Sequence, residues 1–162
     1  MCLALYIASS KPLPLVPWDP DKPAFHVVSL PDDRAAIRKV LRQPHIYYVG
    51  SHEGCSCAFN YEHDFKPAIE LRDYLRKVLT VNKEIEGFAC RPDQESFDVK
   101  HFVTVSPMGV ALPEFFFQEG QRLIFQSRKT LLDKRVRASR ALGLKRKSPD
   151  RPARSRKRMP HL

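Results

Sequence analysis

The sequence lacks the features that mark a membrane or secreted protein. No apolar run approaches the roughly 18 residues that a membrane-spanning helix needs, although 43% of the residues are hydrophobic, which is enough for a core. Residues 1–10 are apolar but contain none of the basic residues that open a signal peptide. Only four cysteines are present, fewer than a disulfide-stabilised secreted chain of this length would use. These absences predict a cytoplasmic protein with reduced cysteines.

No internal repeat is visible, and 162 residues favour one domain with an appendage over two domains. The net charge of +10 is unevenly distributed along the chain. Residues 1–126 contain 14 Lys/Arg and 16 Asp/Glu, whereas residues 127–162 contain 14 Lys/Arg and only 2 Asp/Glu. This asymmetry predicts a nearly neutral globular domain over residues 1–126 and a basic arm over residues 127–162.

Strands and helices are expected to mix without strict alternation, which predicts an α+β fold with one small mixed sheet and two main helices. Four apolar segments are expected to be strands, namely 2–8, 25–30, 45–49 and 85–90. One helix is expected to start near residues 31–33 and to end before Pro44. The second is the clearest in the chain, with apolar residues at helical spacing from Ala68 to Leu79, Asp64 as its cap and an Asp73–Lys77 pair.

The last part of the domain contains a proline-containing helix start at Ser106-Pro107. Residues 115–117 and 123–125 are apolar and flank Glu119-Gly120, which predicts a hairpin or a strand after a loop. In the arm, residues 127–142 have the pattern of a basic helix. Residues 145–162 have almost no apolar side chain to bury, so we expect that segment to be disordered when unbound.

The candidate site is the polar loop that follows the expected strand 45–49. It places His52, Glu53, Cys55 and Cys57 within six positions. Thiolate and imidazole groups are ligands that zinc prefers, so the loop predicts a zinc site of His52, Cys55 and Cys57, completed by Cys2 or Cys90. The opposing interpretation is that the cysteines pack as small hydrophobes. In an extended chain, moreover, the two side chains of Cys-x-Cys point to opposite faces.

The same residues also suit a small thiol-dependent enzyme. A nearby base or positive charge lowers the pKa of a cysteine and turns it into a nucleophile. Cys55, Cys57 or Cys2 would be the nucleophile, with His52 as the base. We take this enzyme as the alternative to a non-enzymatic binding or accessory protein.

The arm predicts non-specific nucleic-acid binding, because clustered positive charge displaces counterions from a phosphate backbone without needing a fold. The expected contacts are Lys145, Arg146, Lys147, Arg151, Arg154, Arg156, Lys157 and Arg158. Two clusters separated by a spacer would also suit a nuclear-import signal in a eukaryotic host. The remaining interpretations are a solvated solubilising tail and contact with an anionic membrane surface.

Several short segments together resemble a group of small bacterial proteins of unassigned function. They are the Met1-Cys2-Leu3 opening, Pro17-Trp18-Asp19, residues 44–51, Glu53-Gly54-Cys55-Ser56-Cys57 and residues 115–117. The resemblance covers roughly the first 126 residues and implies one compact domain, but it implies no activity and no catalytic residue.

Overall fold

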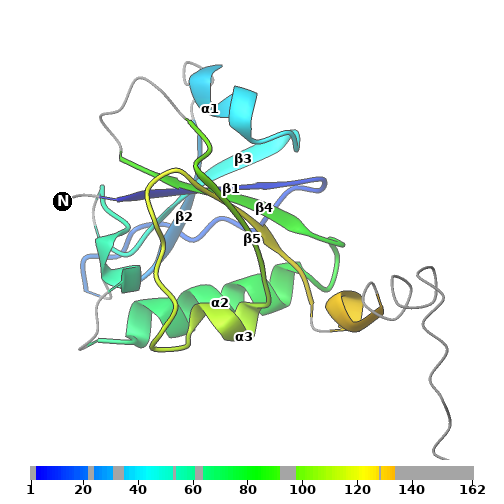
Figure 1. Ribbon diagram of the computed structural model, residues 1–162. Coiled ribbons are helices and arrows are strands. Elements are labelled where there is room, and N and C mark those ends of the chain that lie inside the picture. Colours follow the sequence, from blue (N-terminus) through cyan, green and yellow to red (C-terminus); the bar gives the residue numbers. More distant parts are fainter. Residues whose placement is uncertain are drawn as a thin grey trace, which may run out of the picture.

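The computed structural model describes residues 3–21, 24–30, 35–52, 54–60, 64–91, 98–127 and 129–133. They form one mixed sheet with strand order β2-β3-β1-β4-β6-β5 and helices on both faces (Figure 1), which confirms the α+β prediction. The strands are β1 (Ala4–Ser9), β2 (His26–Ser29), β3 (His45–Gly50), β4 (Ile85–Cys90), β5 (His101–Val105) and β6 (Gln121–Phe125). The helices are α1 (Ala35–Val40), the 3-10 turn η1 (Cys57–Asn60), α2 (Lys66–Val78) and α3 (Pro107–Val110).

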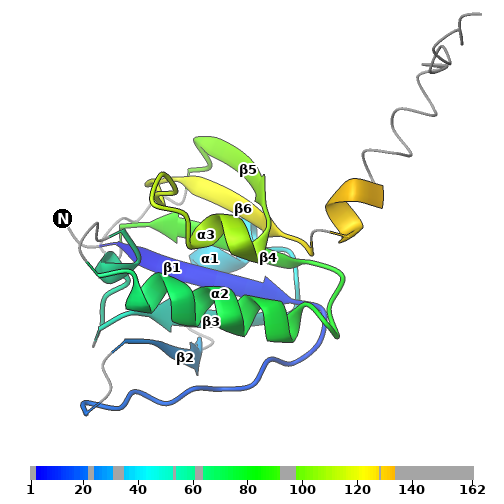
Figure 2. The same cartoon turned by 90° about the horizontal axis from the view of Figure 1, so that it is seen from below.

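β1 and β4 are central and buried along their whole length. Both of their faces are covered, because α2 and α3 lie on one side of the sheet and α1 on the other (Figures 1 and 2). On the α2 side, Leu71 and Leu75 pack with strand residues such as Leu5 and Leu123. On the α1 side, Ile37 packs with residues such as Tyr6 and Phe88. Burial on both faces explains why these strands read as continuous apolar runs rather than as an alternating pattern.

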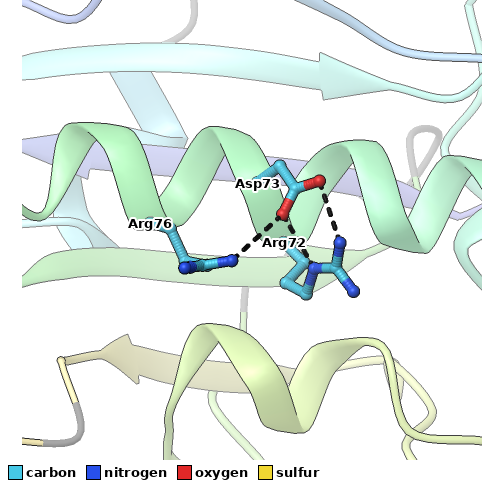
Figure 3. A network of polar contacts seen from close by, with 3 residues as sticks. All are labelled: Arg72, Asp73 and Arg76. Carbon is cyan, nitrogen blue, oxygen red and sulfur yellow. Dashed lines mark hydrogen bonds and ion pairs between the residues drawn. The ribbon is translucent and has the colours of Figure 1, made fainter.

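α2 follows the periodicity expected from the sequence, and its capping differs in detail. The N-cap position is Phe65, one residue later than expected, although the Asp64 carboxylate still accepts the Lys66 N–H at 2.9 Å. Asp73 pairs with Arg72 at 2.8 Å and with Arg76 at 3.7 Å instead of with Lys77 (Figure 3). The hydrogen bond from Arg72 lowers the pKa of Asp73. Because the cluster is solvent-exposed, it contributes little to the stability of the fold.

Of the two structures predicted around Glu119-Gly120, the strand after a loop is confirmed by β6, and the hairpin is wrong. Residues 115–117 form no strand, and β6 instead pairs antiparallel with β4 and parallel with β5. Gly120 occupies the left-handed region at φ +75°, which suits the turn into β6. β5 was not predicted, because most of its residues are exposed and it has no long apolar run. The Ser106 cap is confirmed, since its side chain accepts the Gly109 N–H.

The proline-rich segment after β1 is held against the sheet by tyrosine hydroxyls. The Tyr47 hydroxyl accepts the Leu13 N–H, and the Tyr74 hydroxyl donates to the Pro14 carbonyl, both at 2.8 Å. Farther along, Val16 exchanges two backbone hydrogen bonds with Val27 of β2. The proline-rich segment therefore covers the outer edge of β2, and proline itself offers no N–H for further pairing.

The start of the arm is described only as far as residue 133. Residues 129–133 are helical, which agrees with the beginning of the helix expected over 127–142. The segment expected to be disordered, 145–162, lies outside the described residues. No helix in the described part of the chain has the length and apolar character needed to cross a bilayer.

His26, on β2, is buried at 4% exposure and lies between the rings of Trp18 and Tyr48. Its ring covers the α-carbon of Gly50 so closely that any side chain there would collide with it. Its Nδ1 has no hydrogen-bond partner among the described residues. Burial lowers the pKa of His26, because the charged imidazolium loses its hydration. The native state therefore favours the neutral ring.

We expect the protein to lose stability as the pH falls below about 6.5, the pKa of histidine in the unfolded chain. In that range the unfolded chain binds a proton that native His26 does not, so the free energy of unfolding falls by up to about 1.4 kcal/mol per pH unit until the native pKa is reached. Urea unfolding between pH 7.5 and 5 measures this slope. The slope should be shallower in His26→Phe than in the control His101→Gln, whose histidine is exposed. Equal slopes in the two variants would contradict the assignment.

Candidate functional site

The loop that carries the cysteines leaves the sheet at the end of β3 and lies at the same end of the sheet as the start of β1. The antiparallel register places Leu5 opposite Val49 and Ala4 opposite Cys90, so this end also contains the last residues of β4. The arm begins after β6, at the opposite end (Figure 1). The two features singled out by the sequence are thus separated by the length of the sheet.

A tight turn between His52 and Cys55 shapes the first half of the loop. The His52 N–H donates to the Cys55 carbonyl at 3.0 Å, and the Cys55 N–H donates back to the His52 carbonyl at 3.3 Å. Gly54 lies in the left-handed region at φ +67°, with open space where a side chain would be. Glycine is therefore favoured here by its backbone conformation and not by crowding. This turn explains why the loop is glycine-containing.

Ser56 fastens the loop to the two neighbouring strands. Its buried hydroxyl donates to the Val49 carbonyl of β3 at 2.6 Å and accepts the Leu5 N–H of β1 at 2.9 Å. Its own N–H donates to the Leu3 carbonyl at 2.9 Å. One serine therefore completes the hydrogen bonding of both strands at the point where their ladder ends.

The sulfurs of Cys55 and Cys57 lie at disulfide distance, which argues against the expectation that all cysteines are reduced. The two side chains meet because the chain is not extended here: Cys57 is the first residue of η1, and the curved backbone brings the α-carbons to 5.6 Å, within the range that a disulfide spans. Each sulfur also faces a backbone donor. The Leu3 N–H lies 3.2 Å from Cys57 Sγ, and the Cys57 N–H lies 3.1 Å from Cys55 Sγ.

Of the residues predicted to bind zinc, the structure describes His52, Cys55, Cys57 and Cys90. His52 is exposed, and its Nδ1 lies 3.3 Å from the hydroxyl of Ser51. Cys90 is buried in the core on the α1 side. Within the described ranges, no three His, Cys, Asp or Glu side chains are grouped so that they could hold a metal ion. Cys2, the other proposed ligand, lies outside the described residues, as does Glu53, so the zinc site stays a prediction.

Two further polar residues hold the loop in place, and the sequence analysis missed both. The hydroxyl of Ser51 accepts the Ala58 N–H at 2.9 Å. The Asn60 amide exchanges two hydrogen bonds of 2.8 Å with the backbone of Phe117. Small polar residues are common in loops, so nothing in the local pattern marks these two as structural anchors. Together they fix the loop from both of its ends.

The arm residues proposed to contact nucleic acid, from Lys145 to Arg158, lie outside the described residues. Where the arm begins, the structure has a cavity of about 770 Å³. It is lined by Ser10, Lys11, Gln43, Val81, Lys83, Glu84, Gln126 and Thr130. Gln126 donates to the Glu84 carboxylate at 2.7 Å within this lining. Lys11 and Lys83 add positive charge next to the start of the arm.

Comparisons of the chain with protein-family models, with curated proteins and with solved structures found no match. The geometry of the loop and the charge of the arm are the features of the chain that bear on its function.

Ser56→Ala should destabilise the domain by about 2 kcal/mol, because it leaves the buried Leu5 N–H and Val49 carbonyl without their shared partner. Urea unfolding followed by the fluorescence of Trp18 measures this change. Ser29→Ala is the matched control, since the Ser29 side chain is exposed on β2 and its loss should cost less than about 0.5 kcal/mol. A stability of Ser56→Ala equal to that of the control would contradict the bridging role.

Proposed function

We propose that the loop is a thiol–disulfide redox site in which Cys55 and Cys57 interconvert between a disulfide and a dithiol. The observation that carries this proposal is the pair of backbone N–H groups directed at the two sulfurs. A thiolate is stabilised by such donors, and a stabilised thiolate is both a better leaving group and more abundant at neutral pH.

Accessibility and loop length support the same function. Both cysteines are partly exposed, so a partner's sulfur can reach them, whereas Cys90 is buried. The disulfide closes a ring of only three residues, and so small a ring removes little entropy from the unfolded chain. The bond therefore contributes little to folding. In the cytoplasm, where we propose that the protein resides, disulfides are usually transient, catalytic or redox-sensing.

The exchange proceeds through a mixed disulfide. The Cys57 thiolate attacks one sulfur of an oxidised partner, forms a bond to it and releases the partner's other sulfur as a thiolate. Cys55, after losing its proton, attacks Cys57 Sγ, closes the Cys55–Cys57 bond and releases the partner's second thiolate. Two protein thiols are oxidised, one partner disulfide is reduced, and the two protons from the cysteines pass to the partner's thiolates.

Equilibration with glutathione redox buffers should convert the pair reversibly, with a midpoint between about −270 and −120 mV, the range of redox-active dithiol proteins. Acid quenching, alkylation and mass spectrometry measure the oxidised fraction. Reduction should lower the Tm by no more than about 6 °C, since a three-residue ring contributes about 1.5 kcal/mol.

Two variants complete this test. Cys90→Ser should keep the transition and Cys55→Ser should abolish it, because Cys55 is a member of the pair whereas Cys90 is buried in the core. A midpoint below about −300 mV, as structural disulfides have, would contradict a redox role.

We propose as a second function that the arm binds nucleic acid. The supporting observation is its charge, a net +12 over residues 127–162 against −2 over residues 1–126. Lys11 and Lys83 lie at the cavity where the arm begins and would extend the positive surface onto the domain. The arm and the redox loop lie at opposite ends of the sheet, so one can be occupied while the other reacts.

Binding to DNA or RNA of mixed sequence should weaken steeply as the salt concentration rises, because each neutralised phosphate releases a counterion. Deletion of residues 145–162 should remove most of the affinity and flatten the salt dependence, as measured by fluorescence anisotropy. Cys55→Ser serves as the control and should bind as the unaltered chain does. Absence of binding at low salt would contradict this function.

A further inference from the structure

The two outer strands of the sheet differ in whether their outer edges are covered by another segment. β2 is covered by its backbone pairing with Val16 in the proline-rich segment. β5 has a hydrogen-bonded neighbour on one side only, β6, within the part of the chain that the structure describes. Figure 2 shows β2 and β5 at the two opposite margins of the sheet. Uncovered edge strands are where other strands add, and natural proteins usually protect them.

The parallel register shows which backbone groups face outward. The His101 N–H donates to the Gly120 carbonyl at 3.3 Å, and the Gln126 N–H donates to the Val105 carbonyl at 3.1 Å. Backbone direction alternates along a strand, so His101, Val103 and Val105 direct their polar groups to β6. The N–H and C=O of Phe102 and Thr104 consequently point away from the sheet, where a further strand would bind them.

The side chains along this edge favour association over protection. Phe102 is 62% exposed and Val99 is 47% exposed. Lysine commonly protects an edge strand by its charge. Here the Lys100 ammonium lies 3.0 Å from the Glu119 carboxylate, which also binds Arg91 at 2.7 Å. Lys100 is thus paired within its own chain and repels an incoming strand less than an unpaired lysine would.

We propose that β5 is the interface of a symmetric homodimer, in which two copies pair antiparallel and form one continuous sheet. A two-fold axis that passes beside Phe102 relates the two copies, so that the same strand supplies both sides of the pairing. Phe102 then faces Phe102 of the second copy, an aromatic cross-strand pair, and Val99 faces Val105. His101 faces Val103 and Lys100 lies opposite Thr104, so no like charges are directly opposed. The Lys100 N–H donates to the Gly120 carbonyl at 2.8 Å and takes no part in the pairing. The outward N–H and C=O of Phe102 form the central pair of hydrogen bonds.

A second copy is the occupant that this register favours, because a single sequence satisfies both sides of the pairing. The interface is small, since two strands of five residues meet. Small interfaces associate weakly, so we expect a dimer that forms with increasing protein concentration. The proposal is independent of the redox site, because Cys55 and Cys57 lie in a different segment, between β3 and α2.

Sedimentation velocity of the full chain tests the dimer. Nuclease treatment and high salt prevent association through nucleic acid bound to the arm. The mass should rise from 18.7 kDa toward twice that value as the concentration increases. Phe102→Lys should remain monomeric, because it places two like charges opposite each other, and circular dichroism should show an intact fold. Val28→Lys, on the opposite outer strand, is the matched control and should dimerise like the unaltered chain.

Cysteine cross-linking tests the register itself. Paired residues of an antiparallel ladder have α-carbons about 5.5 Å apart, within the range of a disulfide. Phe102→Cys should therefore form a covalent dimer on oxidation, whereas Val99→Cys should not, because Val99 faces Val105. The unaltered chain is the control for the native cysteines. A chain that stays monomeric at all concentrations, an unaffected Phe102→Lys dimer, or cross-linking of Val99→Cys alone would overturn the proposal.

Discussion

The structure depends on one requirement: every backbone polar group of β1 must be paired, because both faces of this strand are buried and water cannot reach it. β3 and β4 supply most of that pairing. At the start of the strand, however, the Leu5 N–H is satisfied by Ser56 and the Leu3 N–H by Cys57. The cysteine-containing loop is therefore part of the hydrogen bonding of the core and not an addition to it, which explains how a loop positions two sulfurs precisely enough to bond.

The side chains that position the loop are different from the two sulfurs. Ser51, Ser56 and Asn60 position the loop through hydrogen bonds to backbone groups, and Cys57 Sγ has a long-range hydrogen bond with the Leu3 N–H. A disulfide between residues two apart in sequence can thus open without releasing any distant segment. The hydrogen bonds of the Ser51, Ser56 and Asn60 side chains involve neither sulfur, so they do not depend on the bond between Cys55 and Cys57.

Much of the fold was predictable from the sequence because burial leaves a direct signature. The apolar runs of β1 and β4 and the helical spacing from Ala68 to Val78 identified the central strands and the main helix. β5 escaped prediction because an exposed edge strand has no such signature. The pairing of Cys55 with Cys57 escaped it because alternation of side chains holds only for an extended chain, and here η1 begins at the second cysteine. The buried position of His26 depends on the partner strand, where Gly50 leaves room for its ring, and this is a property of register rather than of local pattern.

The position of Leu3 beside the loop has a practical consequence for handling the protein. The Leu3 N–H faces Cys57 Sγ. Only two residues would therefore separate a segment fused ahead of Met1 from this amide. The C-terminal arm leaves from the far end of the sheet (Figure 1). A purification tag, a surface linker or a fluorophore is therefore better joined through the arm, whose described start lies at the opposite end of the sheet from the sulfurs. A fluorophore attached ahead of Met1 would instead be close in sequence to Leu3, which contacts Cys57, and would suit a probe of the oxidation state of the two cysteines.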